Sequence, residues 1–243
     1  MTRLIRGRIL GLEDPLGNFD YSLLAPPPDT LPETVAERTR RVYDRIAGVY
    51  HLSTLFFHTR AHRCALELSG IRDGMRVLEV ATGSGEMFRR LVRVNPNGMT
   101  CGVDLAPNMA ARTWRRVRKS DPGARTNCHA VDARHMAFRD SSFDAIVCCY
   151  LLELLSSEDI ELTLREFRRV LRPRGTFTLT LIGENTELFN RAYRLGGRLA
   201  PAFWGRQVAG RVPDLIEAAG FRVTEDRSVR QGFYPSRVLS ARR

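Results

Sequence analysis

Short apolar runs alternate along most of the chain with longer segments whose apolar residues recur at helical spacing. The apolar runs predict strands over residues 76–81, 98–106, 126–133, 143–153 and 175–183. Helical spacing predicts helices over 85–94, 107–119, 158–171 and 212–221, and two late strands are expected over 222–229 and 236–242. This alternation predicts a doubly wound α/β domain, a mostly parallel sheet with helices on both faces.

The N-terminal part has a different pattern. Residues 1–36 contain a basic apolar stretch and then three consecutive prolines (Pro26–Pro28), which favours an extended arm or linker. Residues 37–70 have apolar residues at helical spacing and end in Gly70, a C-terminal helix stop, so we expect a helical cover there. The chain is thereby divided into an arm and one domain, 37–243.

Composition limits the compartment and the partners. Of 243 residues 43% are hydrophobic, which suits one large domain, and no window approaches the roughly 18 apolar residues of a membrane span. No secretory signal is apparent, and the five cysteines show no C-x-x-C pairing, so we expect reduced thiols, no metal site and a cytoplasmic location.

The formal net charge of +11 has two interpretations. The basic residues are nearly all arginine, with Lys119 the only lysine, and they spread along the chain rather than forming one stripe. A nucleic-acid partner is therefore disfavoured. Peripheral contact with an anionic membrane, at its inner face, stays open.

The turn after the first strand, Ala81–Glu86, reads ATGSGE and lies where a doubly wound sheet binds its ligand. Its two glycines permit unusual backbone conformations and let a ligand approach the main chain. A dinucleotide would require a third glycine where Phe88 stands, and the acids Glu79 and Glu86 would repel its pyrophosphate. The same acids suit a cationic ligand.

Two further acids end the next strands. Asp104 closes the second strand about 20 residues after the glycines, where a carboxylate accepts both hydroxyls of a ribose. Asp132 closes the third, where we expect an adenine amino group. A ligand with a cationic sulfonium and α-amino group, a ribose, an adenine and no phosphate is S-adenosylmethionine, which we predict as the cofactor.

The segment VLEVATGSGE (77–86) resembles the first motif of the class I S-adenosylmethionine-dependent methyltransferases, in particular the ubiquinone/menaquinone-biosynthesis C-methyltransferase branch. That branch tolerates alanine, as at Ala81, where most members have the first glycine. The similarity covers residues 42–182, including MAFRDSSFDAIV and RVLRPRG, and resumes at LIEAAGFRV. It implies a Rossmann-like methyltransferase fold, a seven-stranded sheet whose last strand is antiparallel.

The resemblance also implies a set of cofactor-binding residues at the strand ends, with S-adenosylhomocysteine as the product. They are Glu79, Ala81, Gly83 and Gly85 for the methionine part, Asp104 for the ribose with Leu105 next to it, Asp132 and Ala133 for the adenine, and Tyr150 facing the methyl group.

Two positions depart from that family pattern. The usual Pro-Gly-Gly before the fifth strand reads Pro-Arg-Gly (173–175), on an expected surface turn. Glu153 stands after the fourth strand, where the quinone enzymes have an arginine, and this puts quinone C-methylation in question but not methyl transfer itself.

A catalytic base is needed only if the acceptor atom carries a proton of high pKa. The candidates for catalytic residues are Glu153, Tyr150 and His51. His58 and His62 share one face of the cover helix, and a lone histidine there is more often structural.

Residues 183–212, after the fifth strand, interleave aromatic side chains with arginines and are interpreted as a substrate-side insertion, either a packed helix pair or an apolar lid. The leading hypothesis is methyl transfer to a small lipophilic metabolite: quinone-like, a phospholipid headgroup or a secondary metabolite. An RNA methyltransferase is the first alternative. A non-catalytic regulatory protein that binds adenosylmethionine is the second, disfavoured because the glycines and acids are intact. The oligomeric state is not predicted.

Overall fold

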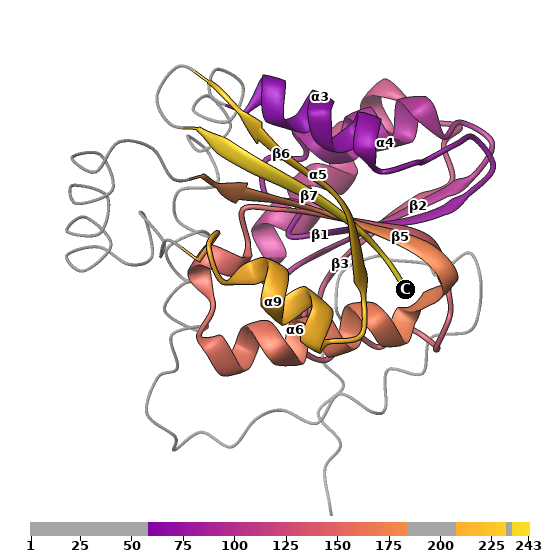
Figure 1. The fold of residues 1–243 in the computed structure, drawn as a ribbon. Coiled ribbons are helices and arrows are strands. Elements are labelled where there is room, and N and C mark those ends of the chain that lie inside the picture. The colour runs from indigo at the N-terminus through magenta and orange to yellow at the C-terminus, as the bar shows by residue number, and fades with distance from the viewer. Residues whose placement is uncertain (1–57, 184–207, 232–234) are drawn as a thin grey trace, which may run out of the picture. The chain divides into compact units, whose positions relative to one another are not determined.

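A computed structural model of the chain describes residues 58–183, 208–231 and 235–243, and this part contains one seven-stranded sheet (Figure 1). The strands are β1 (Arg76–Val80), β2 (Met99–Asp104), β3 (Thr126–Ala130), β4 (Phe143–Cys149), β5 (Leu171–Ile182), β6 (Arg222–Val229) and β7 (Ser236–Arg242). The helices are α3 (Thr59–Leu68), α4 (Glu86–Val94), α5 (Pro107–Ser120), the short 3-10 helix η2 (Leu152–Leu154), α6 (Ser157–Val170) and α9 (Val212–Ala218).

The strand order is β3-β2-β1-β4-β5-β7-β6. The first five strands pair in parallel, and β7 pairs antiparallel with both β5 and β6. The chain runs outward from β1 to β3 and then returns to the other side of β1 at β4. The carboxyl ends of β1 and β4 therefore form the switch point at which such sheets bind ligands. The predicted seven-stranded sheet with an antiparallel last strand is confirmed.

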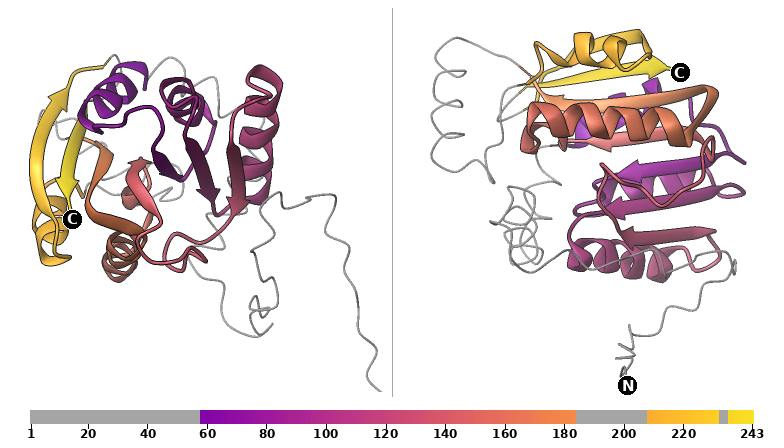
Figure 2. Two further views of the ribbon diagram at one scale, coloured as in Figure 1. Left: turned by 90° about the vertical axis from the view of Figure 1, so that its right-hand side faces the viewer. Right: turned by 90° about the horizontal axis from the view of Figure 1, so that it is seen from below.

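Helices cover both faces of the sheet (Figures 1 and 2). One face packs under α3, α4 and α5, and the other packs against α6 and α9. Strand β1 shows why this sequence suits the arrangement: Val77 belongs to the core cluster under α3 and α4, and Leu78 and Val80 belong to the cluster with α6 and α9. Since side chains alternate along a strand, Glu79 lies on the α3 and α4 face, where it is buried.

Strand β5 begins earlier than its composition predicts. Leu171 already pairs with Phe143, and the register then shifts, so that Thr176 pairs with Ala145. The Pro-Arg-Gly segment occupies this irregularity, with Arg174 exposed at a φ of +65°. Proline and a left-handed residue discourage a strand assignment locally, and only the partner strand reveals the pairing.

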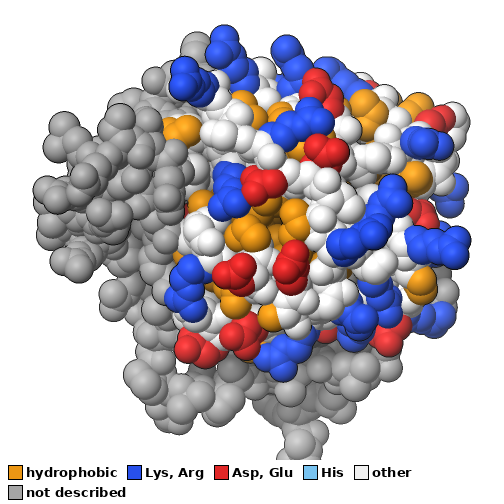
Figure 3. Space-filling model, viewed as in Figure 1, with side chains coloured by type: hydrophobic (Ala, Val, Ile, Leu, Met, Phe, Trp, Pro, Cys, Tyr) orange, Lys and Arg blue, Asp and Glu red, His pale blue; other side chains and the backbone are white. Residues whose placement is uncertain are grey.

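Several predicted regions lie largely outside the described residues. The whole of the arm 1–36 lies outside them. Of the cover 37–70, residues 37–57 lie outside, and of the insertion 183–212, residues 184–207 lie outside. Helix α3 falls within the predicted cover. No helix in the described residues is long and apolar enough to span a membrane. On the face seen in Figure 3, basic and acidic side chains are interspersed around a small apolar area.

Candidate active site

The turn after β1 has three residues in the left-handed backbone region. The φ angle is +64° at Ala81, +48° at Gly83 and +76° at Gly85. A Cβ atom on Gly85 would lie 2.7 Å from Oγ1 of Thr113, so this position requires glycine for space as well as for conformation. A left-handed alanine costs about 1–2 kcal/mol. Such strain persists where the surroundings fix it, and the Ala81 amide is held on the Val103 carbonyl at 2.8 Å.

Asp104, at the end of β2, shapes this turn from the neighbouring strand. Its Oδ2 accepts a hydrogen bond from the Gly83 amide at 2.7 Å, and its Oδ1 accepts one from the Ala106 amide at 2.9 Å. The carboxylate predicted for the ribose thus lies beside the glycine turn and supports it.

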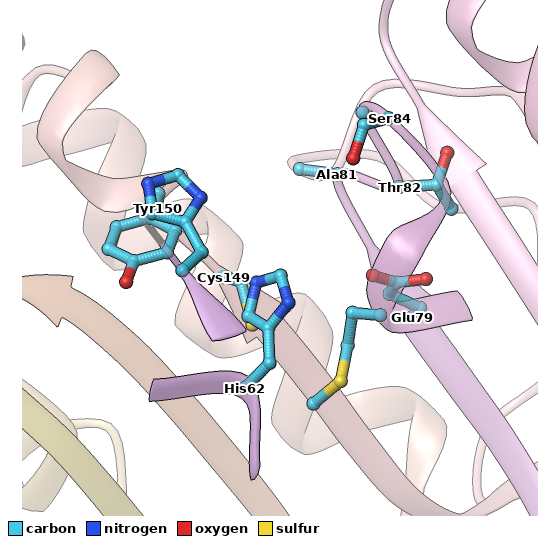
Figure 4. Close-up of a pocket in the computed structure, with 10 residues that line it drawn as sticks. His62, Glu79, Ala81, Thr82, Ser84, Cys149 and Tyr150 are labelled. Atoms are coloured by element: carbon cyan, nitrogen blue, oxygen red, sulfur yellow. The ribbon is translucent and has the colours of Figure 1, made fainter. Parts of the chain in front are cut away.

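A pocket with about 350 Å³ of empty space, part of it open to solvent, lies at the carboxyl ends of β1 and β4 (Figure 4). Four predicted cofactor-binding residues line it: Glu79, Ala81, Gly83 and Tyr150. The other lining residues are His58, His62, Thr82, Ser84, Met87 and Cys149. The pocket therefore coincides with the switch point of the sheet.

Glu79 brings an unusual carboxyl group to the pocket wall. The residue is 1% exposed, and its Oε2 is buried with no hydrogen-bond partner among the described residues. Burial, reinforced by repulsion from the Asp104 carboxylate, raises the pKa of Glu79 well above its usual range. A buried acid in this state takes either a proton or a bound cation.

The side chains of His58, His62 and Tyr150 form what we call the aromatic wall. The His58 ring stacks on Tyr150 with centroids 4.2 Å apart, and His62 lies 5.7 Å from His58 and 6.3 Å from Tyr150. Burial lowers the pKa of His58 to about 4, and burial together with the positive charges of His58 and Arg90 lowers the pKa of His62 to about 3. At neutral pH both imidazoles are uncharged, and so is the aromatic wall.

Tyr150 presents its ring to the pocket while its hydroxyl group is hydrogen-bonded elsewhere. The hydroxyl shares a 2.7 Å hydrogen bond with Ser236 on β7, and Gln231 Nε2 donates to it at 3.3 Å. Gln231 Oε1 also accepts from the Ala61 amide of α3 at 3.2 Å. The backbone of Tyr150 is left-handed, with a φ of +57°. Ala81 follows β1 and Tyr150 follows β4, and both are non-glycine residues with left-handed backbone. Both line the pocket.

Asp132, predicted for the adenine, is occupied by an ion pair. Arg134 Nη2 lies 2.6 Å from its Oδ2, and Arg134 Nη1 lies 2.7 Å from Oδ1 of Asp159 on α6. Burial alone would raise the pKa of Asp132, but the hydrogen bonds and charge of Arg134 outweigh it, and the pKa is lowered. Leu105 and Ala133 are half-buried, and neither lines the pocket.

Glu153 lies in η2 and is 2% exposed. Its Oε1 accepts a hydrogen bond from the Ile182 amide at 2.6 Å, while its Oε2 is buried without a partner in the described part of the chain. Burial raises the pKa of Glu153 to about 7. The side chain joins η2 to the end of β5, and it is not among the residues that line the pocket.

Sequence reasoning missed part of the pocket. His51, preferred as the histidine of the cover, lies outside the described residues. His58 and His62, which were not among the selected catalytic candidates, line the pocket, and their spacing of four was the available signal. Within the residues that the structure describes, no group of three or more His, Cys, Asp or Glu is placed to hold a metal ion.

Comparison with known proteins gives one consistent family. A methyltransferase domain model matches residues 77–175. The ubiquinone/menaquinone biosynthesis C-methyltransferase UbiE of Pseudomonas savastanoi pv. phaseolicola is 30% identical over 190 residues, 74% of this chain and 70% of the relative. The 2-phytyl-1,4-naphtoquinone methyltransferase of Nostoc sp. is 29% identical over 144 residues, 57% of this chain and 62% of that protein.

The fold also matches solved structures. The crystal structure of the [4+2]-cyclase SpnF superposes with a TM-score of 0.70 at 18% identity, over 87% of this chain and 97% of that one. At this identity the likeness concerns the fold alone. The domain match and the UbiE relative carry the assignment: the chain belongs to the class I S-adenosylmethionine-dependent methyltransferases and resembles the UbiE branch.

Proposed function

We propose that this chain transfers the methyl group of S-adenosylmethionine to a small lipophilic acceptor with a quinone-like ring. One observation carries the proposal: the glycine turn with the buried Glu79 and the uncharged aromatic wall line the same pocket. The turn side suits a cationic cofactor, and the aromatic wall suits a flat apolar ring. The relatives named for quinone methylation support this acceptor class.

The residues on the turn side fit S-adenosylmethionine, the cofactor of this family. Glu79 offers a buried carboxylate oxygen that has no partner in the part of the chain that the structure describes, which suits a cationic α-amino group. Left-handed backbone at Ala81, Gly83 and Gly85 lets the ligand approach the main chain. We assign the ribose to Asp104 beside Leu105, and the adenine to Ala133 and Asp132, which then shares its carboxylate with Arg134.

When bound, the cofactor supplies an electrophilic methyl group on a sulfonium. The chain supplies position: aligned contact between two reactants lowers a barrier by about 7–11 kcal/mol. The Tyr150 ring is fixed for this purpose by its strained backbone and by Ser236 and Gln231. Because His58 and His62 are uncharged, the aromatic wall does not repel the cation across the pocket.

Glu153 is our candidate for proton exchange, should the acceptor atom carry a proton. Its pKa of about 7 suits exchange near neutral pH, and its Oε2 has no partner in the described part of the chain. The Tyr150 hydroxyl is less suited, since it is hydrogen-bonded to Ser236. A carboxyl group at position 153 also distinguishes this chain from the arginine-bearing quinone enzymes, so we do not specify whether carbon, nitrogen or oxygen is methylated.

A different reaction on the same fold is the main alternative. The likeness to a cyclase indicates that this fold does not fix the chemistry. An RNA acceptor is less consistent with the spread of the arginines along the chain and with the interspersed charges on the one face that Figure 3 shows. A non-catalytic protein that only binds the cofactor would not need the aromatic wall, to which we assign the acceptor.

Cofactor binding is expected to release a proton from Glu79. Its pKa is raised by burial and by Asp104, and a bound cation would lower it, so affinity for S-adenosylmethionine should rise with pH. Calorimetry in buffers of different ionisation enthalpy measures the release. Glu79→Gln should abolish it and weaken binding about tenfold.

The matched control is Glu86→Gln. This second buried glutamate of the turn is already paired with Arg89, Arg90 and Arg116, at 3.3–3.4 Å, so its loss should leave the proton release unchanged. A release that persists in Glu79→Gln would assign the proton to another group.

The acceptor class is tested with cofactor labelled on the transferred methyl group. The protein is incubated with reduced 2-phytyl-1,4-naphthoquinone, and separately with lysate of its source organism, and label is followed into organic and aqueous phases. Label in the organic phase supports a lipophilic acceptor. Label confined to the aqueous phase excludes one, and no transfer despite cofactor binding favours the non-catalytic alternative.

A further inference from the structure

Nδ1 of His62, a polar atom of the aromatic wall, has no role in the proposed function. His62 is 3% exposed, and its Nδ1 is buried with no hydrogen-bond partner within the described residues. Figure 4 shows the ring of His62 reaching from α3 into the space between Tyr150 and Glu79. A buried polar atom without a partner is costly to the folded protein, so its retention at a pocket wall points to a partner that arrives with a ligand.

The surroundings of His62 restrict the chemistry of that partner. The imidazole is neutral, and the Arg90 guanidinium creates positive potential around it, so a cationic group is disfavoured at His62 itself. A neutral imidazole has one donor and one acceptor nitrogen. A hydroxyl group both donates and accepts, and therefore pairs with Nδ1 in either tautomer. The stacked rings of His58 and Tyr150 beside it suit an aromatic body.

We propose that His62 binds the methyl acceptor directly, through a hydrogen bond between its Nδ1 and a hydroxyl group on the acceptor ring, and thereby selects acceptors that carry such a group. This proposal rests on the proposed function and assigns a specificity-determining residue within it. It also distinguishes the two histidines: His58 supplies stacking on Tyr150, and His62 supplies the polar recognition.

The test compares two probes that differ in one O–H group, 1-naphthol and 1-methoxynaphthalene. Each is titrated calorimetrically into the full-length protein saturated with S-adenosylhomocysteine. Wild type should bind 1-naphthol about tenfold more tightly than its methyl ether. His62→Phe should abolish this preference, and His62→Asn, which keeps a polar atom near the Nδ1 position, should retain part of it. Cys64→Ser, a change on the same helix α3 at a residue that does not line the pocket, should keep it.

Stability separates binding from a structural role. Replacing a polar group that lacks a partner with an apolar ring should raise Tm by about 2–4 °C in His62→Phe, whereas a structural histidine would lower it. His62→Leu is the second apolar variant, free of any clash from the larger phenylalanine ring.

The outcomes distinguish the inference from the function on which it rests. If wild type does not bind S-adenosylhomocysteine, the proposed function fails. If it does, three results would each overturn the role of His62 while the methyltransferase assignment stands: neither naphthalene binds, wild type shows no preference, or both His62→Phe and His62→Leu keep the preference.

Discussion

The Asp104→Ala variant is expected to bind S-adenosylhomocysteine about 30- to 1,000-fold more weakly than wild type, a loss of about 2–4 kcal/mol. Two effects add. The two charge-assisted hydrogen bonds that we propose between Asp104 and the ribose would be lost together. The Gly83 and Ala106 amides also lose the carboxylate that holds the turn, so the ligand meets a less ordered site.

Calorimetry of three variants separates these effects. Asp104→Asn keeps an oxygen for one of the two backbone amides but removes the charge, so it should fall between wild type and Asp104→Ala. Asp144→Ala is the matched control, because this aspartate of β4 also accepts from a backbone amide, that of Arg76, but at the opposite end of the strands. Its cofactor affinity should be unchanged. An Asp104→Ala affinity within twofold of wild type would show that the ribose lies elsewhere.

How far the sequence predicts this fold depends on how local each signal is. Helix α5 was expected over 107–119 and spans Pro107–Ser120, because proline at its start and its own periodicity define it. Strand β5 was expected from residue 175, but it begins at Leu171 because a neighbouring strand pairs with that residue. Pairing between segments nearly 30 residues apart is not visible in either segment.

The candidate site divides in the same way. The glycine turn and Glu79 were predicted from one continuous stretch, and the structure brings them into the pocket. Tyr150 of the aromatic wall was predicted too, but His58 and His62 were not, because their position in the pocket depends on the packing of α3 against β5 and β7. Asp132 and Arg134 are two residues apart in the sequence, so their ion pair depends on local structure. The second ion pair of Arg134, with Asp159, depends on the placement of α6. Acids at strand ends therefore allow the site to be located from the sequence, whereas the aromatic wall opposite them can be identified only from the tertiary structure.

The Glu153→Gln variant is expected to remove a pH dependence from the stability of the protein. Burial raises the pKa of Glu153 from 4.5 to about 7 in the folded chain. Between these values the unfolded chain loses the proton while the folded chain keeps it, so the folded state binds more protons and stability falls as pH rises. The stabilisation is fully present below pH 4.5 and lost above about pH 7. The shift corresponds to about 3 kcal/mol.

Urea denaturation of wild type and Glu153→Gln between pH 4.5 and 7.5 measures this difference. The amide keeps an oxygen for the Ile182 amide and cannot ionise, so wild type should lose stability relative to the variant as pH rises. Glu166→Gln is the control of opposite sign. Burial alone would raise the pKa of Glu166, but hydrogen bonds from Arg169 and the Met136 amide outweigh it and lower the pKa below its usual value of 4.5. When the curves of this control pair are extended below pH 4.5, wild type should therefore lose stability relative to Glu166→Gln as pH falls. If the difference in unfolding free energy between wild type and Glu153→Gln does not change with pH, this carboxyl is ionised over the whole range from pH 4.5 to 7.5. Glu153 would then act as a fixed charge rather than as a group that exchanges a proton.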